Sequence, residues 1–207
     1  GTSNEVAMQQ MVYTRQGVER VIRYAFETAR KRDRQKKLML VDKANAIRAQ
    51  DIWTRTFAEV GEEYPDIERE HAYVDAACMW MVKNPESFDT VVTTNLFGDI
   101  ITDLGAVLQG GMGVAASGNI NPGNVSLFEP IHGSAPKYKG QNVSCPIAAI
   151  AAVYMMLDEL GQTSSASKIE QAIEKVLSSD EVTSVSASSG VSTSEWGDRV
   201  IEALSQL

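Results

Sequence analysis

An α/β fold is predicted by two observations on the sequence. Segments with the apolar spacing of amphipathic helices alternate with short apolar runs of strand length, a pattern typical of a sheet flanked by helices. The 207 residues, 43% of them hydrophobic, are also enough to bury a substantial core as one large or two small domains.

The first half of the chain contains the most regular part of this alternation. Apolar residues recur at helical spacing from Val18 to Ala29, which predicts the first helix. The elements predicted up to residue 93 are, in order, a helix at 17–32, a strand at 37–41, a helix at 51–60, a strand at 70–74, a helix at 75–82 and a strand at 90–93.

The second half begins with an apolar helix predicted at 97–108, which ends at Gly110 and Gly111. A Ser/Thr-rich stretch at 178–194 reads as a loop with one short strand, and Thr193 or Ser194 is expected to cap the last helix. The remaining predictions are a loop at 110–123, a strand at 125–128, helices at 146–160 and 166–177, a strand at 182–185 and a helix at 194–207.

Charge and composition exclude several classes of partner. The formal net charge of −8 argues against nucleic acid and against an anionic membrane surface, because phosphate binding needs clustered Lys and Arg. The one dense basic run, at 30–37, lies where a helix should end, and cations there are solvated and favourable. The sequence has no membrane-spanning stretch and no signal-peptide pattern, so we expect a cytoplasmic protein. Cys78 and Cys145 lack a CxxC spacing and are expected to be buried free thiols.

Asp99 and Asp103 form the sharpest local feature, because residues four apart on a helix share a face. A face with two carboxylates suits a hard cation such as Mg²⁺ or Mn²⁺, but a solvated acidic pair is the common alternative. The apolar residues around the pair strengthen the metal interpretation, because two unpaired buried charges would be costly. Both interpretations stay open on spacing alone.

Two further residues follow predicted strands. Asp75 opens the helix at 75–82, where it would also serve as an ordinary helix cap. Lys43 lies just beyond the strand at 37–41, at the edge where α/β sheets place their sites, although a surface lysine is the simpler interpretation. Tyr13 carries no signal by itself.

A second distinctive segment runs from Leu127 to Pro136. Small residues at Gly133, Ser134 and Ala135 would let the backbone approach a ligand and offer N–H donors to a phosphate. The segment is neither a GxGxxG nor a GxxxxGK[ST] motif, and a lone His132 in such a loop is more often structural than catalytic.

Taken in order, five segments resemble the β-hydroxyacid oxidative decarboxylase family, which includes isopropylmalate and isocitrate dehydrogenases. The resemblance covers nearly the whole chain from Tyr13 onward, and the segments at 63–66 and 191–195 are most similar to isopropylmalate dehydrogenases. The five segments are Val41-Asp42-Lys43-Ala44-Asn45, Tyr73-Val74-Asp75, Asn95-Leu96-Phe97-Gly98-Asp99 with Asp103, Glu129-Pro130, and His132-Gly133-Ser134-Ala135-Pro136.

The resemblance implies a role for each matching residue. Asp99 and Asp103 would bind Mg²⁺ or Mn²⁺ from one subunit, and Asp75 would join them from the partner subunit of a homodimer. Lys43 would accept the hydroxyl proton of a 2-hydroxy acid substrate, and Tyr13 would protonate the enol carbon after carbon dioxide leaves. The residues implied to lie at the NAD cofactor are Asn45, Glu129, His132, Gly133, Ser134, Ala135, Pro136, Lys137, Tyr138 and Cys145.

These roles agree with the chemistry of the reaction. Oxidising a 2-hydroxy acid creates a 2-keto acid, and its β-carboxylate leaves easily only if electrons can flow into the new carbonyl. A divalent cation on that oxygen supplies the electron sink, and a tyrosine is a suitable weak acid for the final protonation.

The choice between NAD and NADP depends on two segments, and a third position bears on cofactor affinity. Lys137 and Tyr138 stand where NAD-using relatives place an acidic residue, as in NADP-dependent isocitrate dehydrogenases. Residues 184–188, however, lack the second Tyr and Arg of those enzymes, so we expect NAD, with NADP as the alternative. Cys145 replaces the usual Asn before Pro146, which removes an amide that reads the adenine.

The implied fold is the C-terminal portion of the isopropylmalate dehydrogenase-like fold, with a mixed sheet flanked by helices and a helical dimer interface on 76–82 and 100–108. Residues 1–110 would form most of the substrate, metal and dimerisation domain, and 111–207 the C-terminal part of the cofactor domain. Family members carry an N-terminal region whose arginines hold the malate carboxylates, and none precedes Tyr13, so this chain is expected to be inactive alone and prone to oligomerise beyond the dimer.

Two classes of function remain for such a chain. The first is oxidative decarboxylation of isopropylmalate, a step of leucine biosynthesis, with tartrate, isocitrate and homoisocitrate as alternative substrates. The second is a catalytically silent dimerising module that still binds metal.

Overall fold

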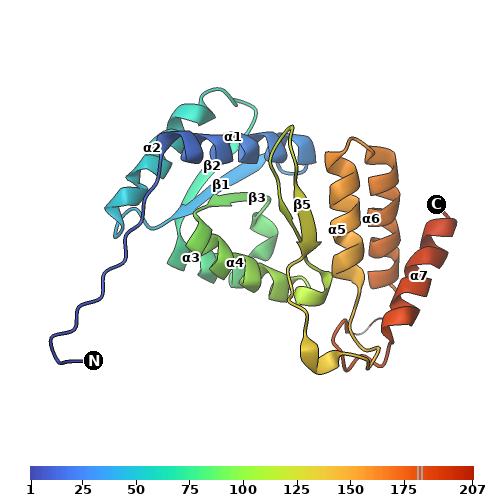
Figure 1. Ribbon diagram of the computed structural model, residues 1–207. Helices are drawn as coiled ribbons and strands as arrows, with labels where there is room; N and C mark the ends of the chain where they lie inside the picture. The colour runs from blue at the N-terminus through green and yellow to red at the C-terminus, as the bar shows by residue number, and fades with distance from the viewer. Residues whose placement is uncertain (181, 183) are drawn as a thin grey trace. The chain divides into compact units, whose positions relative to one another are not determined.

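A three-stranded parallel sheet forms the centre of the first of two units in the computed structural model, which describes residues 1–180, 182 and 184–207 (Figure 1). The units are Gly1–Leu104 and Gly105–Leu207. Strand β1 (Lys37–Asp42) lies between β2 (Glu68–Tyr73) and β3 (Thr90–Thr93) and is parallel to both. Because the carboxyl ends of parallel strands meet at one edge, residues that follow β1 and β2 are brought together there.

Side chains on β1 alternate between two faces of this sheet. Leu38 and Leu40 pack into the core formed with α1 (Arg15–Arg32) and α2 (Asp51–Gly61). Met39 and Val41 pack on the other face, in a cluster that includes Ala77 and Ile101. This period of two explains why the strand reads as a continuous apolar run, since both faces are covered by helices.

The helical pair α1 and α2 is held by aromatic packing and by a capped start. The Thr14 hydroxyl accepts a hydrogen bond from Gly17 N at 3.2 Å and caps α1. Phe26 stacks on Phe57 and on Tyr64, with ring centroids 5.4 and 4.7 Å away. Basic residues at and just beyond the end of α1 are exposed, as the sequence predicts, and the structure shows that Arg30, Arg32 and Lys36 also form ion pairs.

The other face of the sheet carries α3 (Val74–Lys83) and α4 (Asn95–Leu108). Ala77 and Ile101 are buried beneath these helices, which positions α3 and α4 against the sheet. On their outer sides both helices expose large apolar side chains, namely Met79, Trp80, Val82, Leu96, Ile100, Val107 and Leu108.

The second unit joins helices to a two-stranded antiparallel ribbon. Strands β4 (Ala116–Asn119) and β5 (Leu127–Pro130) pair with each other, and α5 (Ile147–Glu159) contacts both. Helices α6 (Thr163–Leu177) and α7 (Thr193–Ser205) complete the core around the fully buried Trp196. Four 3₁₀ turns lie between the longer elements of the described chain: η1 (Arg48–Gln50), η2 (Pro85–Ser87), η3 (Met112–Val114) and η4 (Pro136–Tyr138).

The α/β prediction is confirmed, and its errors are local. Strand β4 lies inside the segment predicted as loop, β5 starts two residues later than expected, and α6 starts earlier, at Thr163. The parallel and antiparallel strands occupy separate sheets rather than one mixed sheet. Val182, Ser184 and Val185 are not in a strand, and the remaining residue of that prediction, 183, lies outside the described residues.

The cap predicted for α7 was wrong by one or two residues. Ser192 is the cap, and its hydroxyl accepts a hydrogen bond from Glu195 N at 3.1 Å. Thr193 instead donates to the Ser144 carbonyl at 2.6 Å.

Both cysteines are free, as expected, but only Cys145 is buried, whereas Cys78 is partly exposed. No helix in the described part of the chain combines the length and the apolar character that a membrane crossing requires.

Candidate acid–base and metal site

Lys43 follows directly after the central strand, at the carboxyl edge of the parallel sheet. Its ammonium group forms an ion pair with the carboxylate of Asp75, which lies in the first turn of α3. The hydrogen bond from Lys43 holds the pKa of Asp75 below its usual range. Asp75 is not the helix cap, because that position belongs to Tyr73. The structure therefore brings two of the predicted site residues into direct contact.

The backbone on either side of Lys43 is fixed by a buried carboxylate. Asp42 is fully buried, and its Oδ1 accepts a hydrogen bond from Ala44 N at 3.0 Å and lies 3.1 Å from His71 Nε2. Its Oδ2 has no hydrogen-bond partner among the described residues. A buried carboxylate without partners is costly, so the imidazole of His71 stabilises the turn that carries Lys43.

Replacing His71 by leucine is expected to lower the free energy of unfolding by about 1 to 3 kcal/mol, because Asp42 loses its imidazole partner while staying buried. Urea unfolding followed by circular dichroism measures the change. In an Asp42→Asn background the same substitution should cost clearly less, since no buried charge is left. An equal cost in both backgrounds would contradict the assigned role of His71.

Tyr13 lies just before α1 and is partly buried against Trp53, with the two rings edge to face and their centroids 5.9 Å apart. Its hydroxyl oxygen accepts a hydrogen bond from Gln50 Nε2 at 3.1 Å. The carbonyl of the same Gln50 side chain accepts from Lys43 N at 2.7 Å. Asn45, two residues after Lys43, is exposed on the following turn.

Asp99 and Asp103 are one turn apart on α4 and both are exposed. The pair is thus not buried within the chain: Ile101 points into the core, whereas the two aspartates face outward, where the same helix also exposes Leu96 and Ile100. Neither carboxylate forms an ion pair or accepts a hydrogen bond from a described residue. An unpaired pair of carboxylates on one face fits two oxygen ligands of Mg²⁺ or Mn²⁺.

One chain does not complete such a site. Among the residues that the structure describes, no three His, Cys, Asp or Glu side chains lie close enough together to hold a metal ion. Asp75 is thus not grouped with Asp99 and Asp103 within the chain.

Apart from Asn45, the residues expected at the cofactor lie in the second unit. Glu129 is exposed on β5, and His132 Nδ1 lies 2.8 Å from the Gly133 carbonyl oxygen. Ala135 adopts the left-handed conformation, with φ of 44°, just before the turn η4. Lys137 Nζ lies 4.6 Å from the centroid of the Tyr138 ring. Gly133, Ser134, Pro136 and Lys137 are exposed, which leaves this loop open to a ligand.

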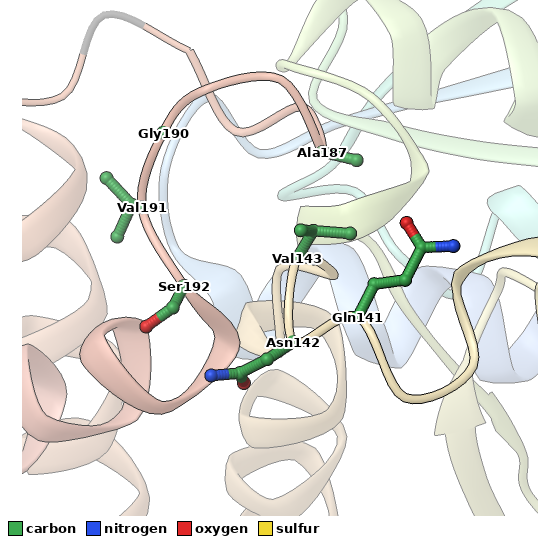
Figure 2. A pocket seen from close by; sticks show the side chains of 7 residues that line it. All are labelled: Gln141, Asn142, Val143, Ala187, Gly190, Val191 and Ser192. Atoms are coloured by element: carbon green, nitrogen blue, oxygen red, sulfur yellow. The ribbon is translucent and has the colours of Figure 1, made fainter.

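A pocket of about 230 Å³ is lined in part by residues that follow this loop along the chain (Figure 2). Residues 141–143 line it from one segment, and Ala187 and residues 190–192 line it from another. The two segments are joined by a hydrogen bond from Thr193 N to the Asn142 carbonyl at 2.9 Å. None of the predicted cofactor residues lines the pocket. Cys145 is buried close by in the sequence, and burial raises the pKa of its thiol.

Sequence reasoning missed three residues that shape this site: Asp42, His71 and Gln50. Asp42 reads as part of a strand, and the other two reach the site only through contacts between distant parts of the chain. Lys43 at the end of the central strand, its partner Asp75 on α3 and the carboxylate face of α4 define an α/β protein with a candidate acid–base and divalent-cation site.

Comparisons with known proteins identify the family to which this α/β protein belongs. Residues 1–200 match the model of the isocitrate/isopropylmalate dehydrogenase family, and the chain belongs to that family. It is 47% identical to a 3-isopropylmalate dehydrogenase of Thermobifida fusca over 210 residues, covering 100% of this chain and 58% of the relative. For the 3-isopropylmalate dehydrogenase of Frankia casuarinae the identity is 49% over 180 residues, with 86% and 52% covered.

Solved structures agree with this assignment. The chain resembles an isocitrate dehydrogenase from Methylococcus capsulatus with a TM-score of 0.86 and 40% identity, covering 93% of this chain and 57% of the other. It resembles a β-decarboxylating dehydrogenase from Thermococcus kodakarensis with a TM-score of 0.87 and 32% identity, covering 100% and 60%. The chain thus spans somewhat more than half the length of the relatives it matches.

Proposed function

We propose that this chain carries the metal-binding and proton-transfer residues of an NAD-linked oxidative decarboxylase that acts on 3-isopropylmalate. The observation that carries the proposal is the contact between Lys43 and Asp75 at the carboxyl end of the central strand, together with the unpaired carboxylates of Asp99 and Asp103. The family match and the names of the relatives support the reaction class and the substrate.

The divalent cation would be held between two copies of the chain. Asp99 and Asp103 would supply carboxylate oxygens from one copy and Asp75 from the other, because one chain does not gather all three. Since Asp75 is paired with Lys43, the two would enter the shared site together. When bound, Mg²⁺ or Mn²⁺ stabilises the negative charge that develops on oxygen as the β-carboxylate leaves.

The chain's own residues would then move the protons. Lys43 would accept the proton that the substrate hydroxyl loses during its oxidation. For this its ammonium group must first release a proton to water, which leaves the neutral ε-amine. The Tyr13 hydroxyl donates a proton to the carbon from which carbon dioxide has left.

In the second unit, Glu129 and the segment 132–138 would hold the cofactor. The exposed loop, with its left-handed Ala135, offers close backbone approach to a phosphate. NAD is the preferred cofactor and NADP the alternative. Lys137 supplies one cation for the 2′-phosphate of NADP, but residues 184–188 supply no second cation.

The shared site requires a homodimer, and the exposed apolar sides of α3 and α4 supply the surface for it.

Met79, 58% exposed, lies on this surface, so Met79→Glu is expected to weaken dimerisation at least about tenfold by burying a charge. Analytical ultracentrifugation measures the dissociation constant. Val21→Glu, at a 42% exposed position of α1, is the matched control and should leave it unchanged. A monomer before mutation, or no change in Met79→Glu, would contradict the interface.

The function itself is tested by complementation. The chain is mixed with the part of the Thermobifida fusca relative that it does not match, and formation of reduced nicotinamide is followed with Mn²⁺ and isopropylmalate, tartrate or isocitrate. We expect activity only in the mixture and a preference for isopropylmalate and NAD. No activity in the mixture, with Mn²⁺ still bound, would instead identify a metal-binding module without catalysis. A preference for another acid would correct the substrate alone.

A further inference from the structure

Gln50 is a fully buried polar residue between two groups to which the proposed function gives proton-transfer roles. Its carboxamide oxygen accepts a hydrogen bond from the backbone N–H of Lys43 at 2.7 Å, and its carboxamide nitrogen donates to the Tyr13 hydroxyl at 3.1 Å. One side chain therefore joins the start of the Lys43 turn to the phenol of Tyr13.

The usual structural reason for a polar side chain at this position does not apply. Gln50 occupies the N-cap position of α2, but its side chain makes no capping hydrogen bond. Burying a carboxamide costs free energy unless it is hydrogen-bonded, and both of the bonds described here point to Tyr13 and Lys43.

The direction of the two bonds is fixed by the chemistry of the groups. A backbone N–H can only donate, so the oxygen of the carboxamide must face Lys43 and the nitrogen must face Tyr13. A carboxamide nitrogen can only donate, so the phenol oxygen accepts from it. The phenol's own proton then points away from Gln50, to Met11 Sδ at 3.7 Å. A thioether sulfur is a weak acceptor, so a stronger acceptor on the substrate can replace it.

We propose that Gln50 is a positioning residue that orients the Tyr13 hydroxyl as a proton donor and fixes the backbone of Lys43. This inference rests on the proposed function. In the step concerned, the electron pair of the enolate forms a C–H bond at the carbon that lost carbon dioxide. The O–H bond of Tyr13 breaks, and the phenolate regains its proton from water.

The decisive variant is Gln50→Glu, which keeps the size of the side chain and an acceptor for Lys43 N–H but replaces the donor to Tyr13 by an acceptor. The phenol must then donate to the carboxylate, and its proton is no longer directed to substrate. Gln50→Met removes both hydrogen bonds without introducing a charge, and it serves if the glutamate variant fails to fold. Gln35→Glu is the matched control, because Gln35 is exposed and hydrogen-bonds only to the Glu86 carbonyl among the described residues.

The first measurement needs no activity. In the 207-residue chain labelled with ¹³C at the ζ carbon of tyrosine, the Tyr13 signal is assigned with Tyr13→Phe. We expect this signal to shift in Gln50→Glu while the amide proton of Lys43 stays protected from exchange, and both to change in Gln50→Met. Neither should change in Gln35→Glu. An unchanged Tyr13 signal in both Gln50 variants would overturn the proposal.

The second measurement uses the complemented protein in D₂O. The unaltered protein should deliver the deuteron to one face of the product carbon. With a misdirected Tyr13, the enol is protonated by water from both faces, so the Gln50 variants should give a mixture of configurations. We expect kcat to fall about 10- to 100-fold with little change in KM. If the unaltered protein is inactive, the proposed function fails and this role falls with it. If it is active and the Gln50 variants keep one configuration, only the role of Gln50 is wrong.

Discussion

Asp99→Asn is expected to weaken Mn²⁺ binding by more than about 100-fold, because the substitution removes a charged oxygen ligand from the proposed site, whose proposed protein ligands are all carboxylates. The structure favours this outcome because Asp99 is exposed and unpaired, so its charge has no other described function in the fold. Isothermal calorimetry on the chain, at concentrations where it is dimeric, measures the affinity. Stability should change little, since the side chain lies on the surface.

The matched control is Asp33→Asn. Asp33 is an exposed aspartate with a left-handed backbone at the end of α1, a conformation that asparagine tolerates well. Its substitution removes the same charge from the chain and should leave Mn²⁺ affinity unchanged. If Asp99→Asn binds Mn²⁺ as tightly as the unaltered chain, Asp99 is not a metal ligand. If both variants lose the same Mn²⁺ affinity, the loss comes from the change in net charge and not from a ligand.

The Asp99 and Asp103 pair shows what the sequence can and cannot predict about a site. Spacing correctly predicts that the two carboxylates share a face of a helix, because that follows from helix geometry alone. The sequence did not indicate which residues of this helix are exposed, because neighbours in sequence need not share an environment in space. Ile101 is 4% exposed and Ile100 is 52% exposed, although they are adjacent. The helix turns them to opposite environments.

The fold also has parts that the sequence predicts and parts that it does not. Helices with long apolar periodicity, such as α1, were located to within two residues. Strand β4, Ala-Ser-Gly-Asn, was missed because its small and polar residues have low strand propensity. Its conformation depends on pairing with β5, where Ser117 lies opposite Glu129. The two hydrogen bonds of the Gln50 side chain, to Tyr13 and to Lys43 N, could not be predicted from the sequence either. Tyr13 is distant from Gln50 along the chain, and no local pattern indicates the contacts.

Lys43→Met is expected to lower the turnover of the complemented protein by about 100- to 10,000-fold, since it removes the group that accepts the hydroxyl proton while keeping a side chain of similar length. The turn should survive, because Gln50 and Asp42 hold it through backbone N–H groups that do not depend on the lysine side chain. Asp75 loses the hydrogen bond that lowers its pKa, yet a carboxyl near its ordinary value of 3.8 stays ionised at pH 7.

Mn²⁺ affinity should therefore be retained or rise in Lys43→Met, because Asp75 no longer pairs with an ammonium group. This separates the variant from Asp99→Asn: one loses turnover with metal bound, and the other loses the metal. Lys83→Met, an exposed lysine in the last turn of α3, is the control and should change neither quantity. A Lys43→Met protein with near-normal turnover would show that another group takes the substrate proton, and a parallel loss of Mn²⁺ would show that Lys43 acts by shaping the metal site.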